Sequence, residues 1–296
     1  MIQVNSIHKP LLLLISVVLF GFTVEAKEKY KKEFDKSYDV NSDVLFDMRA
    51  NFADVNLESW DQNKIEIHVE VIVDAKSESD AEKTFDKIEV SMSGSSSKVS
   101  LKTEVDGKTD NNDWDMNISI KMPKSGQLDV NNSFGSLTIN EILGRCDIEI
   151  GYGDLEVDNL PHKENDIKVS FGDGEIDRIG GGDIAVEFGD LEIDELSSSA
   201  DITCSYGELE IDRVKSTCTE LDIQNDFGSV SITLESGSNY EIEATSSFGD
   251  VSVPSSATIT KEKSDFTSES IRANVGSGAG GTIDVHCSFG DVDIDM

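Results

Sequence analysis

The sequence has little of what most redox, metal and nucleic-acid sites are built from. Its four cysteines are scattered and form no CxxC pair, so no disulfide scaffold is predicted, although export would permit a disulfide. The four histidines do not cluster, so a histidine-based zinc site has no support. Basic residues number 25 against 59 acidic ones, and the net charge of −34 argues against nucleic acid or an anionic membrane as partner.

Long apolar runs are also scarce, because the chain has one only, from Leu11 to Phe22. Lys9 precedes this run, and Val24 and Ala26 stand where a signal peptidase expects small residues, so residues 1–26 are predicted to be a cleaved signal peptide. The run is shorter than the roughly 20 residues that a spanning helix needs. No cysteine follows it, which disfavours a lipoprotein. We therefore expect an exported, soluble protein without a membrane span after cleavage, either periplasmic or secreted to the cell surface.

What the sequence does contain is a repeat, an aromatic residue followed by glycine and then by an acid or serine. Successive glycines of this unit lie 18, 19, 17, 18, 21, 21 and 41 residues apart, and the last gap predicts either a degenerate coil or a long excursion. The aromatic–glycine pairs are Phe134-Gly135, Tyr152-Gly153, Phe171-Gly172, Phe188-Gly189, Tyr206-Gly207, Phe227-Gly228, Phe248-Gly249 and Phe289-Gly290.

Other positions recur when the copies are aligned on the aromatic residue, which we number 0. An Asp stands at −5, an Ile or Val at −4, a mostly apolar residue at −2, and apolar residues at +3, +5 and +8. The inward positions before the glycine, −4 and −2, are even-numbered, whereas +3 and +5 after it are odd-numbered. Side chains of one continuous strand alternate strictly between its two faces, so a single strand cannot turn both sets inward. The chain must therefore turn a corner at the glycine, whose backbone tolerates unusual dihedral angles.

These offsets predict an all-β fold, a parallel β-solenoid (β-helix) with coils of roughly 18–21 residues. Each coil is expected to hold a strand, a glycine corner, a second strand and a third side held by the +8 residue. The aromatic side chains are expected to stack inside the core, with only the acid looking outward. Coils stacked ~4.8 Å apart would give a rod about 40 Å long. The alternative, an antiparallel meander, would not keep every column in register.

The N-terminal third, residues 27–128, is predicted to be a β-rich cap that shields the open end of the solenoid. Residues 47–57 match the repeat, with Ala53 in place of glycine, and are interpreted as a first coil detached from the main array. Strands are expected at 64–73, 98–105 and 114–122, and a short helix at 79–87. Residues 129–296 are predicted to form the solenoid, with 254–281 as a loop or irregular coil.

The segments D-V-N-L-E-S-W-D and K-I-E-I-H-V-E-V, followed by repeated S-F-G-D-[LV]-x-[IV] units, resemble a known family. It is the "putative adhesin" domain of unknown function, which is common in exported bacterial proteins and similar to the head GIN domains of Bacteroidetes. The likeness covers nearly all of the mature chain. The resemblance implies the solenoid fold and an adhesin label that rests on architecture, and it offers no catalytic residues to carry across.

The stacked coils are expected to align their acidic residues in ladders. One ladder holds Asp154, Asp173, Asp190 and Glu208, and others run through the −5 and +6 positions. Carboxylates spaced ~5 Å apart repel each other, and hard cations such as Ca²⁺ would relieve that repulsion. The first ladder is therefore a candidate calcium site, although no EF-hand loop or calcium-binding nonapeptide repeat is present. The alternative is a solvated acidic face that keeps the rod soluble.

A catalytic site is not predicted, because residues 129–214 hold five basic residues against 22 acidic ones and nothing resembles a nucleophile–base pair or a phosphate loop. We expect a non-enzymatic exported scaffold, an adhesin or cell-envelope interaction protein that presents acidic faces to an unknown protein or glycan. A calcium-binding structural or stress-response protein of the envelope is the alternative, and a polysaccharide-active β-helix enzyme is a more distant one. No cofactor other than Ca²⁺ is suggested.

Overall fold

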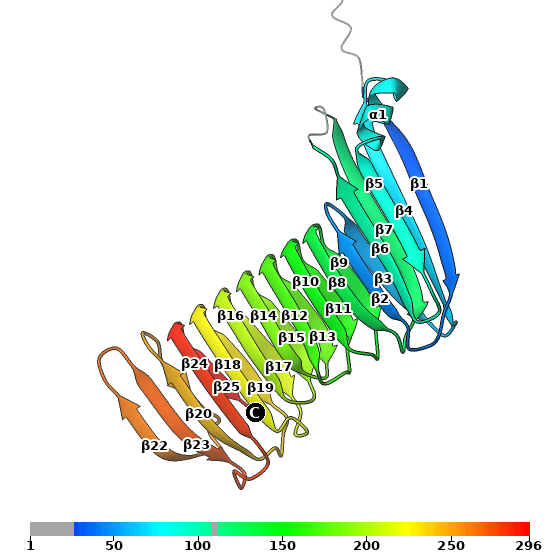
Figure 1. The fold of residues 1–296 in the computed structure, drawn as a ribbon. Helices are drawn as coiled ribbons and strands as arrows, with labels where there is room; N and C mark the ends of the chain where they lie inside the picture. Colours follow the sequence, from blue (N-terminus) through cyan, green and yellow to red (C-terminus); the bar gives the residue numbers. More distant parts are fainter. Residues whose placement is uncertain (1–26, 108–111) are drawn as a thin grey trace, which may run out of the picture.

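The computed structural model describes residues 27–107 and 112–296, which form a long rod of two β-sheets with a β-rich cap at one end (Figure 1). The predicted signal peptide lies outside the described residues. Within the described part of the chain, no helix is both long and apolar enough to cross a membrane.

The first sheet has twelve strands among the described residues. In spatial order they are β1 (Glu28–Asp39), β4 (Lys64–Ala75), β7 (Asp113–Pro123), β3 (Asp54–Trp60), β9 (Leu137–Glu141), β11 (Leu155–Asn159), β13 (Gly174–Ile179), β15 (Leu191–Leu196), β17 (Leu209–Val214), β19 (Val230–Leu234), β25 (Val292–Asp295) and β21 (Val251–Ser252).

The second sheet has thirteen described strands and faces the first. In spatial order they are β22 (Thr258–Ser264), β23 (Glu269–Val275), β20 (Tyr240–Ser246), β24 (Thr282–Phe289), β18 (Glu220–Phe227), β16 (Ala200–Tyr206), β14 (Gly182–Phe188), β12 (Asn165–Phe171), β10 (Cys146–Tyr152), β8 (Gln127–Phe134), β2 (Leu45–Ala50), β6 (Lys98–Val105) and β5 (Ile88–Gly94).

Each repeat contributes one strand to each sheet, joined at the glycine corner. β10 and β11 form one such coil, and β12 and β13 form the next. β10 pairs in parallel with β12, and β11 pairs in parallel with β13. Asp147 pairs with Asp166 and Ile148 with Ile167, so equivalent positions of successive repeats are neighbours. The parallel pairing confirms the predicted solenoid and excludes the antiparallel meander for the repeats.

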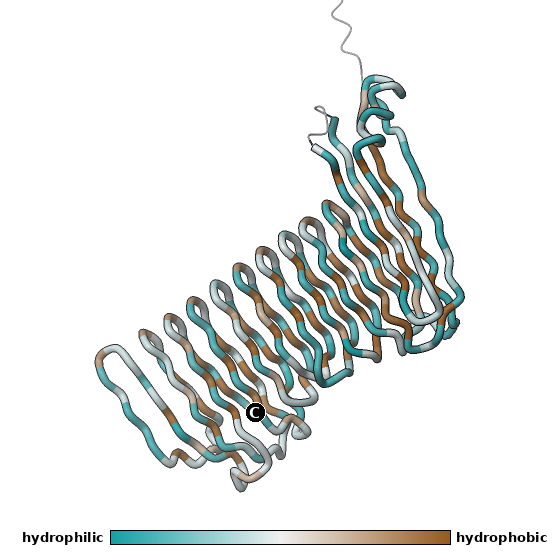
Figure 2. Tube along the Cα trace, viewed as in Figure 1, coloured by the Kyte–Doolittle hydropathy of each residue, from teal (hydrophilic) through white to brown (hydrophobic). Residues whose placement is uncertain are grey.

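The core lies between the two sheets and is filled by the predicted apolar columns. Side chains along the repeat strands mostly alternate between buried apolar and exposed polar residues, which Figure 2 shows as alternating colours along the rod. The +8 residues are buried as predicted, but they close the end of the second strand and do not hold a third side of the coil. These residues are Ile142, Leu160, Ile179, Leu196 and Val214.

The first coil is separated from the others in sequence only. β2 pairs in parallel with β8, and β3 pairs in parallel with β9, so residues 45–60 stack directly on the main array. The prediction of a detached coil was wrong, because residues 61–126 leave the rod and return to the place where the stack continues.

The cap consists of that excursion together with β1. β6 and β7 extend the two sheets by one more parallel strand each, and β5, β4 and β1 then add antiparallel strands. The helix α1 (Glu78–Phe85) begins after the N-cap residue Ser77, whose side chain accepts a hydrogen bond from the backbone N–H of Asp80. The predicted strands at 64–73, 98–105 and 114–122 and the predicted helix are all present.

The far end of the rod differs from the expectation of a loop at residues 254–281. β22 and β23 form an antiparallel hairpin there, with all of β22 exposed at the edge. Residues 254–257, 265–268 and 276–281 lie outside the strands, and the last of these segments is a glycine-rich linker. The long gap in the repeat is thus an excursion. After it, β24 and β25 do not continue the rod but lie between the β18–β19 coil and the β20–β21 coil (Figure 1).

Candidate interaction surface

The aromatic residues of the repeat lie on the outside of the rod, not in its core. Nine rings stack face to face along one corner, with centroids 4.6–5.0 Å apart and planes within 5° of parallel. Their exposed fractions range from 38 to 59%. We call this set the aromatic ladder; in spatial order it contains Phe52, Phe134, Tyr152, Phe171, Phe188, Tyr206, Phe227, Phe289 and Phe248.

The expectation of core-facing rings failed because the corner has no interior space for them. The backbone of one corner lies directly on that of the next, and a Cβ added to Gly189 would lie 2.0 Å from the carbonyl oxygen of Gly172. Aliphatic side chains such as Val186 and Leu191 fill the core on either side of this corner. The aromatic side chain therefore points outward at the corner, and its ring faces are buried by stacking on the neighbouring rings.

Some −2 residues are polar and bind the carbonyl groups of the corner. The buried Asn132 donates from its Nδ2 atom to the carbonyl oxygens of Ala53 and Gly135, at 2.8 and 2.9 Å. Asn225 donates to the carbonyl of Gly207 at 3.2 Å, and Ser246 to that of Gly290 at 2.7 Å. These bonds satisfy the side-chain donors of the polar residues in the −2 column, which otherwise holds aliphatic residues and cysteine.

The acid at +2 is exposed but has a structural task that the sequence analysis missed. Asp154 accepts a hydrogen bond through Oδ1 from the backbone N–H of Asp173 at 3.0 Å, and Asp173 accepts one from Asp190 at 2.8 Å. Ser136 accepts the equivalent bond through its hydroxyl from Asp154. Because Asp Oδ1 and Ser Oγ can both accept this backbone hydrogen bond, either residue can join a coil to the next, which explains why both occur at this position of the motif.

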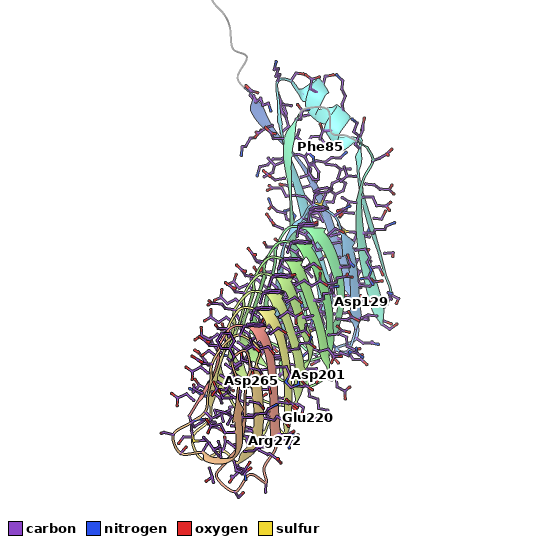
Figure 3. The ribbon with its side chains drawn as sticks, turned by 90° about the vertical axis from the view of Figure 1, so that its left-hand side faces the viewer. Phe85, Asp129, Asp201, Glu220, Asp265 and Arg272 are labelled. Carbon is purple, nitrogen blue, oxygen red and sulfur yellow. The ribbon has the colours of Figure 1, made fainter. Side chains whose placement is uncertain are left out.

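A second acidic column runs along the outer face of the thirteen-stranded sheet, at position −5. Nine carboxylates are in register there, and Figure 3 shows two of them, Asp129 and Asp201, on the same flank of the rod. Desolvation, followed by the charges of Asp166 and Asp129, raises the pKa of Asp147. The column consists of Asp47, Asp129, Asp147, Asp166, Asp183, Asp201, Asp222, Asp284 and Glu243.

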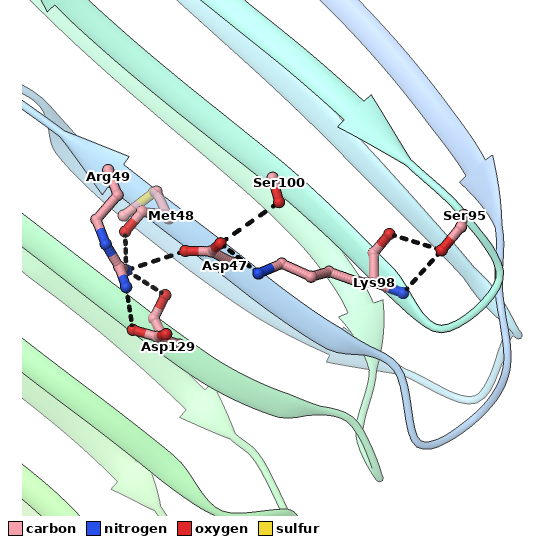
Figure 4. Close-up of polar contacts among 7 residues, drawn as sticks. All are labelled: Asp47, Met48, Arg49, Ser95, Lys98, Ser100 and Asp129. Carbon is pink, nitrogen blue, oxygen red and sulfur yellow. Dashed lines mark hydrogen bonds and ion pairs between the residues drawn. The ribbon is translucent and has the colours of Figure 1, made fainter.

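At the cap end of this acidic column, Arg49 of β2 and Lys98 of β6 compensate the carboxylates, and at the far end Arg272 lies 2.6 Å from Glu243. Arg49 contacts Asp47 at 3.1 Å and Asp129 at 2.7 Å, and Lys98 contacts Asp47 at 2.7 Å (Figure 4). Arg49 also donates to the backbone carbonyl of Met48. Cross-strand ion pairs of this kind fix the β2, β6 and β8 register on the outer face.

The face of the twelve-stranded sheet carries its own charge columns. Arg213 lies 3.4 Å from Glu195, and Lys215 lies 3.7 Å from the same carboxylate and 3.0 Å from Glu235. Arg178 is in register with Glu195 on the neighbouring strand. The basic residues here neutralise nearby acids, and Arg178 on β13 and Arg213 on β17 lie two coils apart.

The residues of the candidate calcium ladder lie in one column along successive coils, as predicted. Their binding of Ca²⁺ stays a prediction. The structure uses one carboxylate oxygen of Asp154, Asp173 and Asp190 to bind the next coil's backbone N–H. Among the residues that the structure describes, no group of three or more His, Cys, Asp or Glu side chains is arranged to hold a metal ion.

The four cysteines are free and buried. Burial raises the pKa of the Cys146 thiol to about 12 and that of Cys218 to about 11, so these thiols stay protonated at neutral pH. Cys204 and Cys287 share the −2 column, but Asn225 lies between them. Protonated thiols without solvent access are poor nucleophiles, so no redox or catalytic site is indicated here.

The cap carries a shallow groove of about 390 Å³ on the outer face of its sheet. Asp35, His68 and Ser119 lie in one cross-strand row there, and His68 Nδ1 is 2.8 Å from Asp35 Oδ1. His68 thus pairs with one carboxylate on an open sheet face.

The matched family model covers residues 47–295, so the chain belongs to the Toastrack DUF4097 family. This confirms the resemblance seen in the sequence and agrees with the all-β parallel solenoid. A search of curated proteins finds no match.

Several solved structures share weak similarity with the chain. A protein of Clostridium sporogenes described as a putative cell adhesion protein is 12% identical, with 90% of this chain and 99% of that chain covered and a TM-score of 0.28. A putative adhesin of Bacteroides fragilis is 13% identical, with coverage of 67 and 96% and a TM-score of 0.39. A putative lipid binding protein of Parabacteroides distasonis is 12% identical, with coverage of 90 and 96% and a TM-score of 0.38.

Proposed function

We propose that this protein is an exported, non-enzymatic interaction scaffold of the cell envelope, adhesin-like in use, and that the aromatic ladder is its binding surface. The observation that carries the proposal is the exposure of nine stacked rings in one continuous stripe. Rings of 150–250 Å² that are 38–59% exposed leave on the order of 800 Å² of apolar surface. The largest apolar patch of an ordinary monomer is roughly 300–600 Å², and larger ones mark interaction sites.

The surroundings of the ladder indicate the chemistry of the partner. Stacking occupies the ring faces, so a sugar could stack fully only on the end ring, Phe248. The +2 carboxylates of Asp154, Asp173 and Asp190 run beside the stripe. A polypeptide that presents a row of apolar side chains with Lys or Arg next to them would complement both features, which favours protein over glycan as the ligand.

A labelled peptide of alternating Leu and Lys is a suitable probe for this surface. We expect it to bind the mature chain, and we expect Phe171→Ser with Phe188→Ser to weaken binding about tenfold or more while circular dichroism stays unchanged. Glu192→Gln, on the face of the twelve-stranded sheet, is the matched control and should bind as the wild type does. Equal binding of a Leu–Glu peptide, or equal binding by the double variant, would contradict the proposal.

Export is the second part of the proposal, and it is supported by the leader-like residues 1–26 of the sequence. Fractionation of cells that express the full chain tests it. Protease-accessible protein at the cell surface would support adhesion, periplasmic retention would support a structural role in the envelope, and cytoplasmic protein with an uncleaved N-terminus would refute export.

Calcium binding by the Asp154, Asp173, Asp190 and Glu208 ladder is the alternative function. The in-register acidic columns favour it, because each added carboxylate repels the next. A calcium titration followed by thermal unfolding distinguishes the two ideas. A melting temperature that rises with millimolar Ca²⁺, and not with equal ionic strength of Na⁺, would support a site; an unchanged one would exclude it.

A further inference from the structure

The order of the coils in space differs from their order in sequence at the far end of the rod. β24 lies between β18 and β20 and pairs in parallel with both, and β25 lies between β19 and β21 (Figure 1). We call residues 282–295, which form β24 and β25, the inserted coil. The rest of the described chain reaches it through one connection, the linker of residues 276–281.

The two coils that flank the inserted coil present the same register to it. Ile283 pairs with Leu221 on one side and with Ile242 on the other. Phe289 stacks on Phe227 at 4.9 Å and on Phe248 at 5.0 Å. The flanking coils are therefore consecutive repeats whose columns would also match each other directly. The structure holds a slot between them that is one coil wide.

The chain segment that crosses the slot is long enough for both an open and a closed slot. Residues 235–239 join β19 to β20 across two coil spacings, whereas residues 215–219, also five in number, join β17 to β18 across one. The linker to the inserted coil is rich in glycine, with Gly276 and Gly278 at positive φ. Ser277 donates to the side chain of Asn239 at 2.9 Å. The Ser277 hydroxyl also donates to Asn239, and the carbonyl of Gly281 accepts from the N–H of Glu241, so these are the bonds that a change of path must break.

Exposing the inserted coil to solvent would cost much free energy, because the coil carries a full set of apolar core residues. Ile283, Val285, Cys287, Val292 and Ile294 are each at most 3% exposed. A coil that leaves its own slot must bury this surface in another slot of the same shape. The only partner certain to contain such a slot is a second copy of the chain.

We propose that the inserted coil is exchangeable, so that residues 282–295 of one copy occupy the slot of a second copy and give a domain-swapped dimer. Every contact of the coil is kept in the exchange, and only the glycine-rich linker changes its path. The repulsion of Asp284 with Asp222 and Glu243 is the same in the monomer and the swapped dimer, but the net charge of −34 on each chain makes two copies repel each other and opposes their association. The dimer fraction is therefore expected to rise with ionic strength.

Cysteine trapping tests the exchange directly. Gln224 and His286 are register partners on the exposed face of β18 and β24. A Gln224→Cys chain and a His286→Cys chain are mixed at high concentration, warmed below the unfolding transition, cooled and oxidised. We expect a disulfide-linked heterodimer, identified by mass, in an amount that is at least fivefold above the control and increases with protein concentration and salt.

The control mixture contains Ala185→Cys and Thr203→Cys, which are register partners in the middle of the rod. One chain that carries both Gln224→Cys and His286→Cys verifies that the variants fold, because it should oxidise within the monomer. A heterodimer yield no greater than that of the control would overturn the proposal. A further chain carries both Gln224→Cys and Thr245→Cys, which lie on opposite sides of the inserted coil. An intrachain disulfide in this chain without any interchain product would also overturn the proposal, since it would show that the slot closes within one copy.

Discussion

At the scale of single residues, the repeat unit has three different tasks at one corner. The glycine allows two backbones to approach, the third residue binds the next coil, and the aromatic residue leaves the core. Gly172, Gly189 and Gly290 have φ between 145 and 155°, and an added Cβ at each would meet a carbonyl oxygen of the neighbouring corner at 2.0–2.2 Å. Glycine is thus required here twice over, by conformation and by space.

Replacing Gly189 by Ala should destabilise the rod by about 2 kcal/mol or more, because both backbone strain and a collision with Gly172 are introduced. Chemical denaturation monitored by circular dichroism measures this. Gly237→Ala is the control for strain alone, since Gly237 also has a positive φ but nothing lies within 4 Å of an added Cβ. A Gly189→Ala loss no larger than that of Gly237→Ala would contradict the close approach.

The hydrogen bond from the +2 residue gives a second prediction. Asp173→Ala should cost about 1 kcal/mol, because the N–H of Asp190 loses its acceptor, whereas Asp173→Ser should cost less since Ser136 makes the same bond. Differential scanning calorimetry compares the two variants. If Ser and Ala lower the melting temperature equally, the side-chain oxygen of this column is not a structural acceptor.

At the scale of the strand and its column, like charges in register weaken the folded state. The pKa of Asp147 is raised, so its charged form is disfavoured on folding and stability falls as the pH rises through that raised pKa. Asp147→Asn should therefore raise the melting temperature at pH 7, and the difference should vanish below the ordinary aspartate value of 3.8, where both states are protonated. Thermal melts between pH 3 and 7 measure this.

Glu235 is the matched control of opposite sign. The backbone N–H of Ser216, followed by Lys215 and the Ser216 hydroxyl, lowers its pKa to about 2. Its charged form is favoured on folding, so Glu235→Gln should lower the melting temperature at pH 7, and this loss should fade as the pH falls from 4.5 towards 2. A pH profile of the same sign for both variants would contradict the assigned causes.

At the scale of the whole molecule, the pattern of the sequence predicted the solenoid and its columns, because a strict period with a fixed change of parity has few structural solutions. The sequence pattern could not place the aromatic ring at position 0. The alternation of inward and outward side chains assigns that position to the core, although the corner has no interior space for a ring. It could not reveal the inserted coil either. Phe248 and Phe289 are successive units in the sequence, and nothing local shows that the second one lies nearer to Phe227.

The position of the aromatic ladder is the central claim, and the solvent accessibility of the tyrosines tests it most directly. Tyr152 and Tyr206 belong to the ladder and are each 49% exposed, whereas Tyr240 is 1% exposed in the core. In photo-CIDNP NMR, with signals assigned by Tyr152→Phe and Tyr206→Phe, we expect strong polarisation for both ladder tyrosines and none for Tyr240. Silent Tyr152 and Tyr206 signals in the folded monomer would contradict an outward-facing ladder.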